Sequence, residues 1–428
     1  MKPVAVAGLF VLLCANACAA DLSAPRVTDP ASLSLRQAET LFLANNPSLA
    51  LARHAVEGSR ADVLSADRNV APPVISYNAS SIDTRRGIGA GSLPTKQMDQ
   101  SLRVDMTLER GDKRALRTEA ANARLVASQD DLANAGRSQL ASLRTAYYDL
   151  LLAQEKRHIA DDSATLAQKM LDVATLRLQA GDISPAEVSR IRVDALRTLN
   201  DVRQTQADQR RAQEALAYLI GQESNAPTLA AVDDWPAPTD QPLPADLDRA
   251  LDGRPDVLAA QARLAAAEKA LRLAHALRKR DLTVGVMYER FPGQSTNNGY
   301  GIGLSAPLAT DGYYSGEIGR AEADRLAAET ELARVRAAAR GDILRSQSDL
   351  SAAAERVERF RSSLLDEARR AAEGAEFAYR HGAIGVTDLL DARRTYHAIR
   401  IEAVTAQADY AKALAAWQAA LSQGESSP

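Results

Sequence analysis

Cysteine is nearly absent from this 428-residue chain, and both cysteines, Cys14 and Cys18, lie near its start. Residues 1–20 combine an early lysine, an apolar run and small residues at the end, which predicts a secretory signal peptide. The mature chain then has no thiol for a disulfide or a thiolate metal site. A lipidated Cys18 is the alternative, but residues 15–17 lack the leucine usually found three positions before such a cysteine.

Aromatic residues make up only 4% of the chain, and alanine supplies much of its 46% hydrophobic content. Small side chains of this kind favour thin, closely packed helices over a thick globular core. A net charge of −3 gives no basic excess for nucleic acid. Beyond the signal peptide, no run of 18 apolar residues predicts a transmembrane helix.

Motifs of catalysis and metal binding are also missing. The sequence has no glycine-rich phosphate loop, no serine elbow and no HExxH helix, so it predicts no enzyme and no cofactor. Its five histidines are scattered, and none lies four residues from another histidine or a cysteine. No zinc site is therefore predicted.

The chain does contain long stretches without proline. No proline occurs between Pro307 and Pro428, and segment 313–380 predicts a single helix roughly 100 Å long at 1.5 Å per residue. The segment 379–392 turns this helix into another. After the turn, from 389 to 420, small and apolar residues recur at a spacing of three and four, which is typical of coiled-coil packing.

The same design occurs 201 residues earlier, in a helical hairpin predicted at 112–220. The shift places Gly181 on Gly382 in the turn and Val188 on Leu389 in the following helix. Both the turn and the packing register are repeated. We therefore interpret the chain as an internal duplication.

The duplication predicts the division of the chain. The first repeat covers 21–221 and the second covers 245–422, with its own helical hairpin at 313–422. Segment 222–244 between them contains five prolines, which exclude a long helix and indicate a connector. A short tail, 423–428, follows the second repeat.

Each repeat also contains a pair of segments in which apolar and polar residues alternate. These predict strand hairpins at 74–108 and 281–306, with one face for lipid and one for water. Strands of about ten residues have the length that a tilted transmembrane strand needs. The less favoured alternative is two small soluble sheets that cap helical bundles.

Four strands cannot close a barrel, and an open sheet edge is not tolerated in lipid. The chain must therefore oligomerise if these hairpins span a membrane. Three copies would supply twelve strands, an allowed even number. The signal peptide favours the bacterial outer membrane as the location of this barrel.

In their order and duplication, these features resemble the TolC-like outer-membrane efflux proteins. The resemblance covers nearly the whole mature chain and includes Asn45-Asn-Pro47, Arg254-Pro-Asp-Val257, the proline-rich connector and the paired turns. Two further motifs, Glu109-Arg-Gly-Asp-Lys-Arg114 and Asp388-Leu-Leu-Asp-Ala-Arg-Arg394, look most like the CzcC-type members of heavy-metal efflux systems.

The resemblance implies an α+β membrane protein that assembles as a homotrimer. Its twelve-stranded β-barrel would lie in outer-membrane lipid, continuous with a barrel of long coiled-coil helices in the periplasm. The expected partners are a periplasmic adaptor (membrane fusion) protein and an inner-membrane resistance-nodulation-division pump. The expected function is an exit duct, here for heavy-metal cations.

The tips of the two helical hairpins hold the candidate site residues. Ser184 and Glu187 form a capping box with proline at the first helical position. The resemblance implies that the exposed turns dock onto the adaptor, where small residues permit close packing. These turn residues are Gly181, Asp182, Ile183, Gly382, Ala383 and Ile384.

A candidate gate lies beside the second turn. Asp388 would be favoured in a first helical turn by the helix dipole alone, but Asp391 lies one turn further on the same face. The resemblance implies that both line the periplasmic constriction as stacked acidic rings that attract cations. Tyr379 matches a tyrosine that latches the tip in the family, whereas Ile384 replaces an arginine of that latch.

Two alternatives remain open from the sequence. A duct of the same architecture for drugs, dyes or secreted polypeptides would have the same features, because selectivity is expected mainly from the pump and adaptor. A coiled-coil structural protein that spans the envelope without a pore would need the helices but not the four alternating strands.

Overall fold

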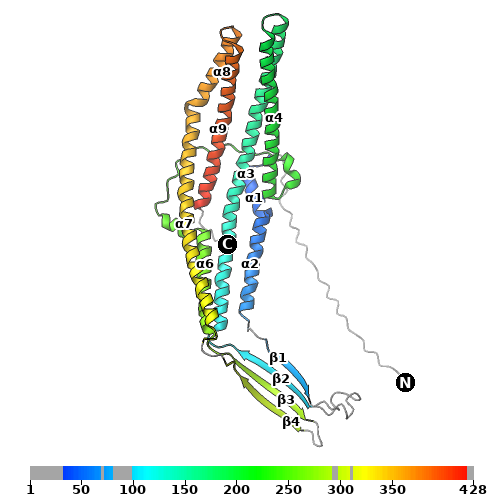
Figure 1. Ribbon diagram of the computed structural model, residues 1–428, viewed down its shortest axis with the longest axis vertical. Helices are drawn as coiled ribbons and strands as arrows, with labels where there is room; N and C mark the ends of the chain where they lie inside the picture. Colours follow the sequence, from blue (N-terminus) through cyan, green and yellow to red (C-terminus); the bar gives the residue numbers. More distant parts are fainter. Residues whose placement is uncertain (1–31, 69–71, 81–98, 292–296, 309–311, 422–428) are drawn as a thin grey trace, which may run out of the picture.

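The computed structural model describes residues 32–68, 72–80, 99–291, 297–308 and 312–421. The predicted signal peptide with Cys18 and the tail 423–428 lie outside the described residues. Long helices run along the molecule, and a four-stranded sheet lies at the end opposite the hairpin tips (Figure 1). The shorter helices are α1 (Leu35–Asn45), α2 (Pro47–Ala66), the 3₁₀ helix η3 (Glu223–Thr228), α5 (Leu247–Asp252) and α6 (Pro255–Ala276).

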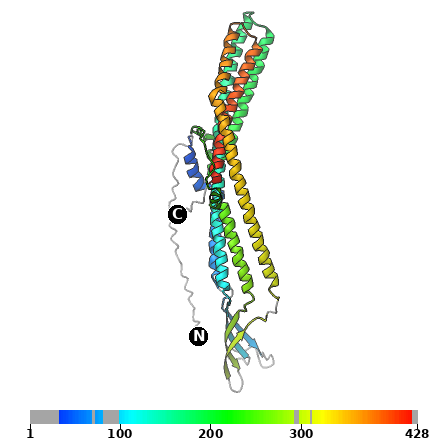
Figure 2. The ribbon, with the colours of Figure 1, turned by 90° about the vertical axis from the view of Figure 1, so that its left-hand side faces the viewer.

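Two long helical hairpins build most of the molecule, and both reach the same end (Figures 1 and 2). The first consists of α3 (Lys113–Gln179) and α4 (Pro185–Ile220). The second consists of α7 (Ser315–Arg359), a π-helical turn η4 (Phe360–Leu364), α8 (Leu365–Arg380) and α9 (Val386–Leu421). At 67 residues, α3 is about 100 Å long.

The helix predicted at 313–380 is continuous from 315 to 380, but it contains a π turn that the sequence did not predict. Phe360 begins this turn and is only 8% exposed, in an apolar cluster with Tyr410 and Trp417 of α9. A π turn holds one more residue than an α turn, which changes the rotation of the helix beyond it. No proline or glycine marks this place in the sequence, so the periodicity alone does not reveal it.

The four strands form one antiparallel sheet in the order β1-β2-β3-β4. They are β1 (Val74–Ser80), β2 (Asp99–Leu108), β3 (Leu282–Phe291) and β4 (Asn297–Ser305). The central pair, β2 and β3, joins the two repeats in sequence. The register places apolar residues opposite apolar residues in rows across the sheet, such as Ile75, Val104, Val286 and Ile302.

This apolar face is uncovered in the single chain. Exposed fractions reach 71% for Ile75, 56% for Val286 and 86% for Ile302. In the described part of the chain, β1 and β4 also each have an edge with no partner strand. None of the described helices is both long and apolar enough to span a bilayer.

Two apolar clusters hold the helices together near the middle of the molecule. One surrounds Phe42, Tyr147 and Leu216, and the other surrounds Ile343, Tyr410 and Trp417. These side chains are at most 2% exposed. Each full burial of a large apolar side chain contributes about 1.5–3 kcal/mol, so the clusters can hold helices that are otherwise thin and alanine-rich.

Tyrosines from both hairpins hold the proline-rich connector. The Tyr147 hydroxyl of α3 donates to the Leu33 carbonyl or the Asp233 carboxylate, both 2.9 Å away, and accepts from the Asp233 amide at 3.2 Å. The Tyr410 hydroxyl of α9 accepts from the Thr239 amide at 3.0 Å. The connector forms only an isolated bridge with Leu33 at Ala231 in the described residues, so these hydroxyls supply partners for other backbone groups of the connector.

A network of ion pairs fixes the sheet to the helices. The Lys113 side chain is buried, and its Nζ donates to the Asp281 carboxylate at 2.8 Å. Arg117 holds Glu109 through two hydrogen bonds of 2.8 and 3.0 Å. Gly111 allows the bend here, because its φ of 82° is costly for other residues. The motif at 109–114 therefore has a structural role.

Candidate functional site

The two hairpin tips have the same backbone geometry. Gly181 and Gly382 have φ angles of 81° and 72°, a left-handed conformation that glycine adopts without a steric cost. The Asp182 amide donates to the Arg177 carbonyl at 2.9 Å, and the Ala383 amide makes the equivalent bond to Ala378 at 2.9 Å. Both turns are exposed at the free end of the molecule.

The helices that leave the two turns begin differently. In α4 the Ser184 hydroxyl accepts from the Glu187 amide at 3.3 Å, and the Glu187 carboxylate accepts from the Ser184 amide at 3.1 Å. In α9 the matching positions are Gly385 and Asp388, and Asp388 lies in the first helical turn. A carboxylate there is favoured by the helix dipole.

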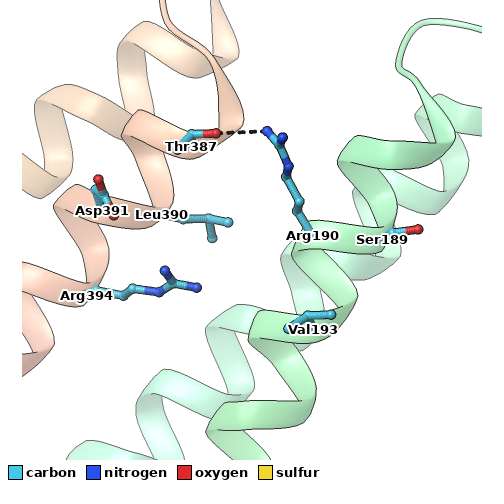
Figure 3. A pocket seen from close by; sticks show the side chains of 7 residues that line it. All are labelled: Ser189, Arg190, Val193, Thr387, Leu390, Asp391 and Arg394. Atoms are coloured by element: carbon cyan, nitrogen blue, oxygen red, sulfur yellow. Dashed lines mark hydrogen bonds between the residues drawn. The ribbon is translucent and has the colours of Figure 1, made fainter.

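Asp388 and Asp391 lie one turn apart on α9, and both are exposed. Among the described residues, neither carboxylate has a hydrogen-bond or ion-pair partner, whereas nearby Asp194 pairs with Arg394 at 2.9 Å. Figure 3 shows the Asp391 carboxylate turned away from α4, while Leu390 points toward α4. The two acids are therefore accessible to solvent.

Tyr379 packs where the two hairpins meet. It lies against a buried apolar cluster formed by Ala174, Val188, Ile191, Val386 and Leu390. The Arg177 guanidinium of α3 lies 5.9 Å from the centre of the Tyr379 ring, within the range of a cation–π interaction. Ile183 packs against the same cluster, whereas Ile384 does not belong to it.

Arg177 was not among the site residues predicted from the sequence. It lies in the last turn of α3, where the helix dipole favours any basic residue, so its position in the sequence does not indicate a further role. The contact with Tyr379 depends on how the two hairpins are rotated toward each other, which the residue spacing within one hairpin does not determine. Arg177 thus supplies a cation from the first hairpin beside Tyr379 of the second.

Polar contacts connect the hairpins just behind the tips. Arg190 of α4 donates to Thr387 of α9 at 3.1 Å, and a groove of about 400 Å³ lies between these helices (Figure 3). Within the second hairpin, Arg393 of α9 pairs with Glu376 of α8 at 3.0 Å. Burial would raise the pKa of Glu376, but the hydrogen bond and charge of Arg393 lower it below its usual range.

A second cavity of about 380 Å³ lies farther from the tip, between α3, α4 and α9. Among the described residues, the Nε2 atom of His397 is the one buried side-chain polar atom without a hydrogen-bond partner. Burial lowers the pKa of His397, and the charges of Arg400 and Arg197 act in the same direction. Asp201 and Asp194 oppose this shift, but the net pKa stays below its usual range.

The lowered pKa predicts a loss of stability in mild acid. Unfolded His397 takes up a proton near its usual pKa of about 6.5, whereas the folded chain resists protonation, so folding becomes less favourable below that pH. We expect the thermal midpoint to fall by a few degrees between pH 7 and pH 5, and His397→Gln to reduce this fall. The exposed His54→Gln is the control, and equal pH profiles for both variants would contradict the prediction.

Comparison with known proteins agrees with this architecture. The model of the family described as "Outer membrane efflux protein" matches residues 40–222 and 247–423. The chain belongs to the outer membrane efflux protein family. The gap between the matched segments covers most of the proline-rich connector, and the matched segments contain both hairpin tips.

Individual relatives of this efflux protein match over most of its length. It is 26% identical to the cobalt-zinc-cadmium resistance protein CzcC of Cupriavidus metallidurans over 86% of this chain and 85% of that protein. It is 27% identical to the pyoverdine export outer membrane protein OpmQ of Pseudomonas putida, over 66% of this chain and 61% of that protein. A membrane protein from Pseudomonas aeruginosa has the same fold, with a TM-score of 0.77 and 18% identity. The match covers 91% of this chain and 93% of that protein.

Membership of the family confirms several expectations from the sequence. The protein is an outer membrane efflux channel with a long periplasmic helical part, and its family transports solutes rather than catalysing reactions. The resemblance to TolC-like proteins and the α+β fold with long helices and four strands are confirmed. The alternative of an envelope-spanning protein without a pore has no support.

Proposed function

We propose that this efflux protein is the exit duct for heavy-metal cations in a tripartite system. The observation that carries the proposal is the pair of exposed carboxylates Asp388 and Asp391 at the free end of the helices, which have no partner in the part of the chain that the structure describes. Carboxylates are good transient ligands and attractants for divalent cations. The relative CzcC, a cobalt-zinc-cadmium resistance protein, supports the same substrate class.

The duct requires three copies of the chain. Edges of β1 and β4 that are unpaired in one chain would pair between neighbours and close a barrel of twelve strands, which leaves no edge in lipid. The apolar rows of the sheet would then face lipid. Below this barrel, the long hairpins of the three copies would surround a periplasmic tunnel.

Three copies would also convert the two aspartates into two stacked rings. Six carboxylates at one constriction would concentrate cations and repel anions, and protons or divalent ions would lower that charge. Tyr379 with Arg177 would hold the second hairpin against the first at the same level. We propose this contact as the latch that keeps the constriction narrow.

The partners are proposed at the tips. The turns at 181–183 and 382–384 and the groove beside Arg190 would receive a periplasmic adaptor protein, which connects the duct to an inner-membrane resistance-nodulation-division pump. Glycine at both turns permits close approach of another helical hairpin. The duct itself would supply the path and the gate, and the pump would supply the energy.

Growth of a strain that lacks this protein tests the substrate class. The panel comprises cobalt, zinc, cadmium, nickel, copper and silver salts beside dyes, bile salts and antibiotics. We expect sensitivity confined to metals, restored by the wild-type chain. Sensitivity to dyes, bile salts or antibiotics with unchanged metal tolerance would contradict the proposal and favour the alternative of a duct for amphiphilic drugs.

A further inference from the structure

A positively charged band surrounds the base of the sheet, where the strands meet the helices. It comprises residues 67–68, 109–117 and 278–281, which we call the junction band. Hydrogen bonds join the three segments, since Arg117 donates to the Arg68 carbonyl and Lys113 to the Lys279 carbonyl. The band contains eight basic and four acidic residues, a net charge of +4, although the whole chain carries −3.

Three of the four acidic residues in the band form ion pairs with basic residues of the same band. Glu109 is held by Arg117, Asp281 by Lys113 and Asp67 by Arg114, at distances of 2.8 to 3.1 Å. The excess positive charge therefore remains at the surface. Outside these three pairs, Arg68, Arg110, Arg278 and Lys279 of the band are exposed.

The band adjoins the apolar face of the sheet. Leu108 of β2 pairs with Leu282 of β3, and the same alternation continued by two residues gives Arg110 and Arg280. The Arg110 amide donates to the Asp281 carboxylate at 2.9 Å, so the two segments stay adjacent at this level. A row of basic residues thus follows directly after the last row of leucines.

The opposite end of the apolar face is bordered differently. Tyr77, Tyr288 and Tyr300 lie in one row across the sheet, and the rings of the last two are 5.4 Å apart. This row is six residues, or about 20 Å, from the leucine row along β3. Tyrosines are typical of a membrane–water interface, so the apolar face has one aromatic border and one basic border.

We propose that the junction band binds the headgroups of anionic phospholipids on the periplasmic side of the outer membrane. The helices extend from this side, so the basic border lies at the periplasmic leaflet. Arginine and lysine bind phosphate oxygens through charge-assisted hydrogen bonds, and basic residues near an anionic membrane surface are attracted to it. The lipid chains would lie along the apolar face beside the same residues.

Lipid titrations of the purified full-length protein in detergent test the proposal. The thermal midpoint is measured with phosphatidylglycerol or phosphatidylcholine of identical acyl chains. We expect phosphatidylglycerol to raise the midpoint by several degrees more than phosphatidylcholine, because a ligand of the folded state stabilises it. The extra stabilisation is expected to shrink at high salt.

The variant Arg110→Gln with Arg278→Gln should lose most of the extra stabilisation. Arg110→Lys with Arg278→Lys keeps the charge and should retain it, which separates lipid binding from a folding defect. Arg203→Gln with Arg210→Gln, exposed on α4 and far from the sheet, is the matched control. Equal effects of both lipids, full retention in the glutamine variant, or the same stabilisation by inorganic phosphate alone would overturn the proposal.

Discussion

Replacement of Arg254 by methionine is expected to destabilise the protein by roughly 3–5 kcal/mol, the usual cost of breaking a buried ion pair. Arg254 is 1% exposed and holds Asp256 through two hydrogen bonds of 3.0 and 2.6 Å. It also donates to the Ala420 carbonyl at the end of α9, at 3.2 Å. One guanidinium thus joins α6 to the end of the second hairpin.

The variant would leave Asp256 with a weaker partner. Arg137 approaches the Asp256 carboxylate only at 3.5 Å, and burial together with the charge of Arg254 lowers the pKa of Arg137. Burial would raise the pKa of Asp256, but the hydrogen bond and charge of Arg254 hold it below its usual range. Without Arg254, the remaining pair is longer and the carboxylate is only partly neutralised.

Chemical denaturation of the purified protein measures this loss. The control is Arg263→Met, which removes an exposed pair with Asp131 and should cost less than about 1 kcal/mol. Similar losses for the two variants would show that Arg254 is a surface charge in solution. That result would contradict the buried position described above.

The second large effect is expected from Asp388→Asn combined with Asp391→Asn. If three copies place these acids at one constriction, the double variant removes six negative charges from the narrowest part of the pore. We expect the preference for cations over anions to fall severalfold. The sensitivity of the conductance to pH and to divalent ions should fall with it, since both act on the carboxylates.

Single-channel recordings in planar bilayers measure this selectivity. Asp172→Asn with Glu214→Gln removes the same charge per chain from exposed positions of the first hairpin away from its tip and serves as the control. Unchanged selectivity in the Asp388 and Asp391 variant, or an equal loss in the control, would count against acidic rings in the pore.

The alternation of apolar and polar residues in the strands and the internal duplication made the architecture predictable from the sequence. A strand has a side-chain period of two, so the apolar rows through Val104 and Val286 could be assigned to one face before the register was known. Gly181 and Gly382 identified both turns because a left-handed residue after a helix is usually glycine. These features depend on neighbours in the sequence.

Contacts between the hairpins could not be predicted in the same way. Arg254 is an ordinary charged residue in the sequence, and its burial arises because α6, α7 and α9 converge on it. The contact of Arg177 with Tyr379 and the cavity around His397 likewise depend on helix rotation. A π turn near Phe360 changes that rotation without a proline or glycine to mark it.

The central claim is that heavy-metal cations leave the cell through this duct. The most direct measurement uses cells loaded with cobalt, zinc or cadmium and transferred to metal-free medium. Elemental analysis then gives the metal that remains in the cells over time. Cells that lack the protein should retain at least one of these metals, and the wild-type chain should restore its release. Equal release with and without the protein, together with retention of a fluorescent dye, would contradict the claim.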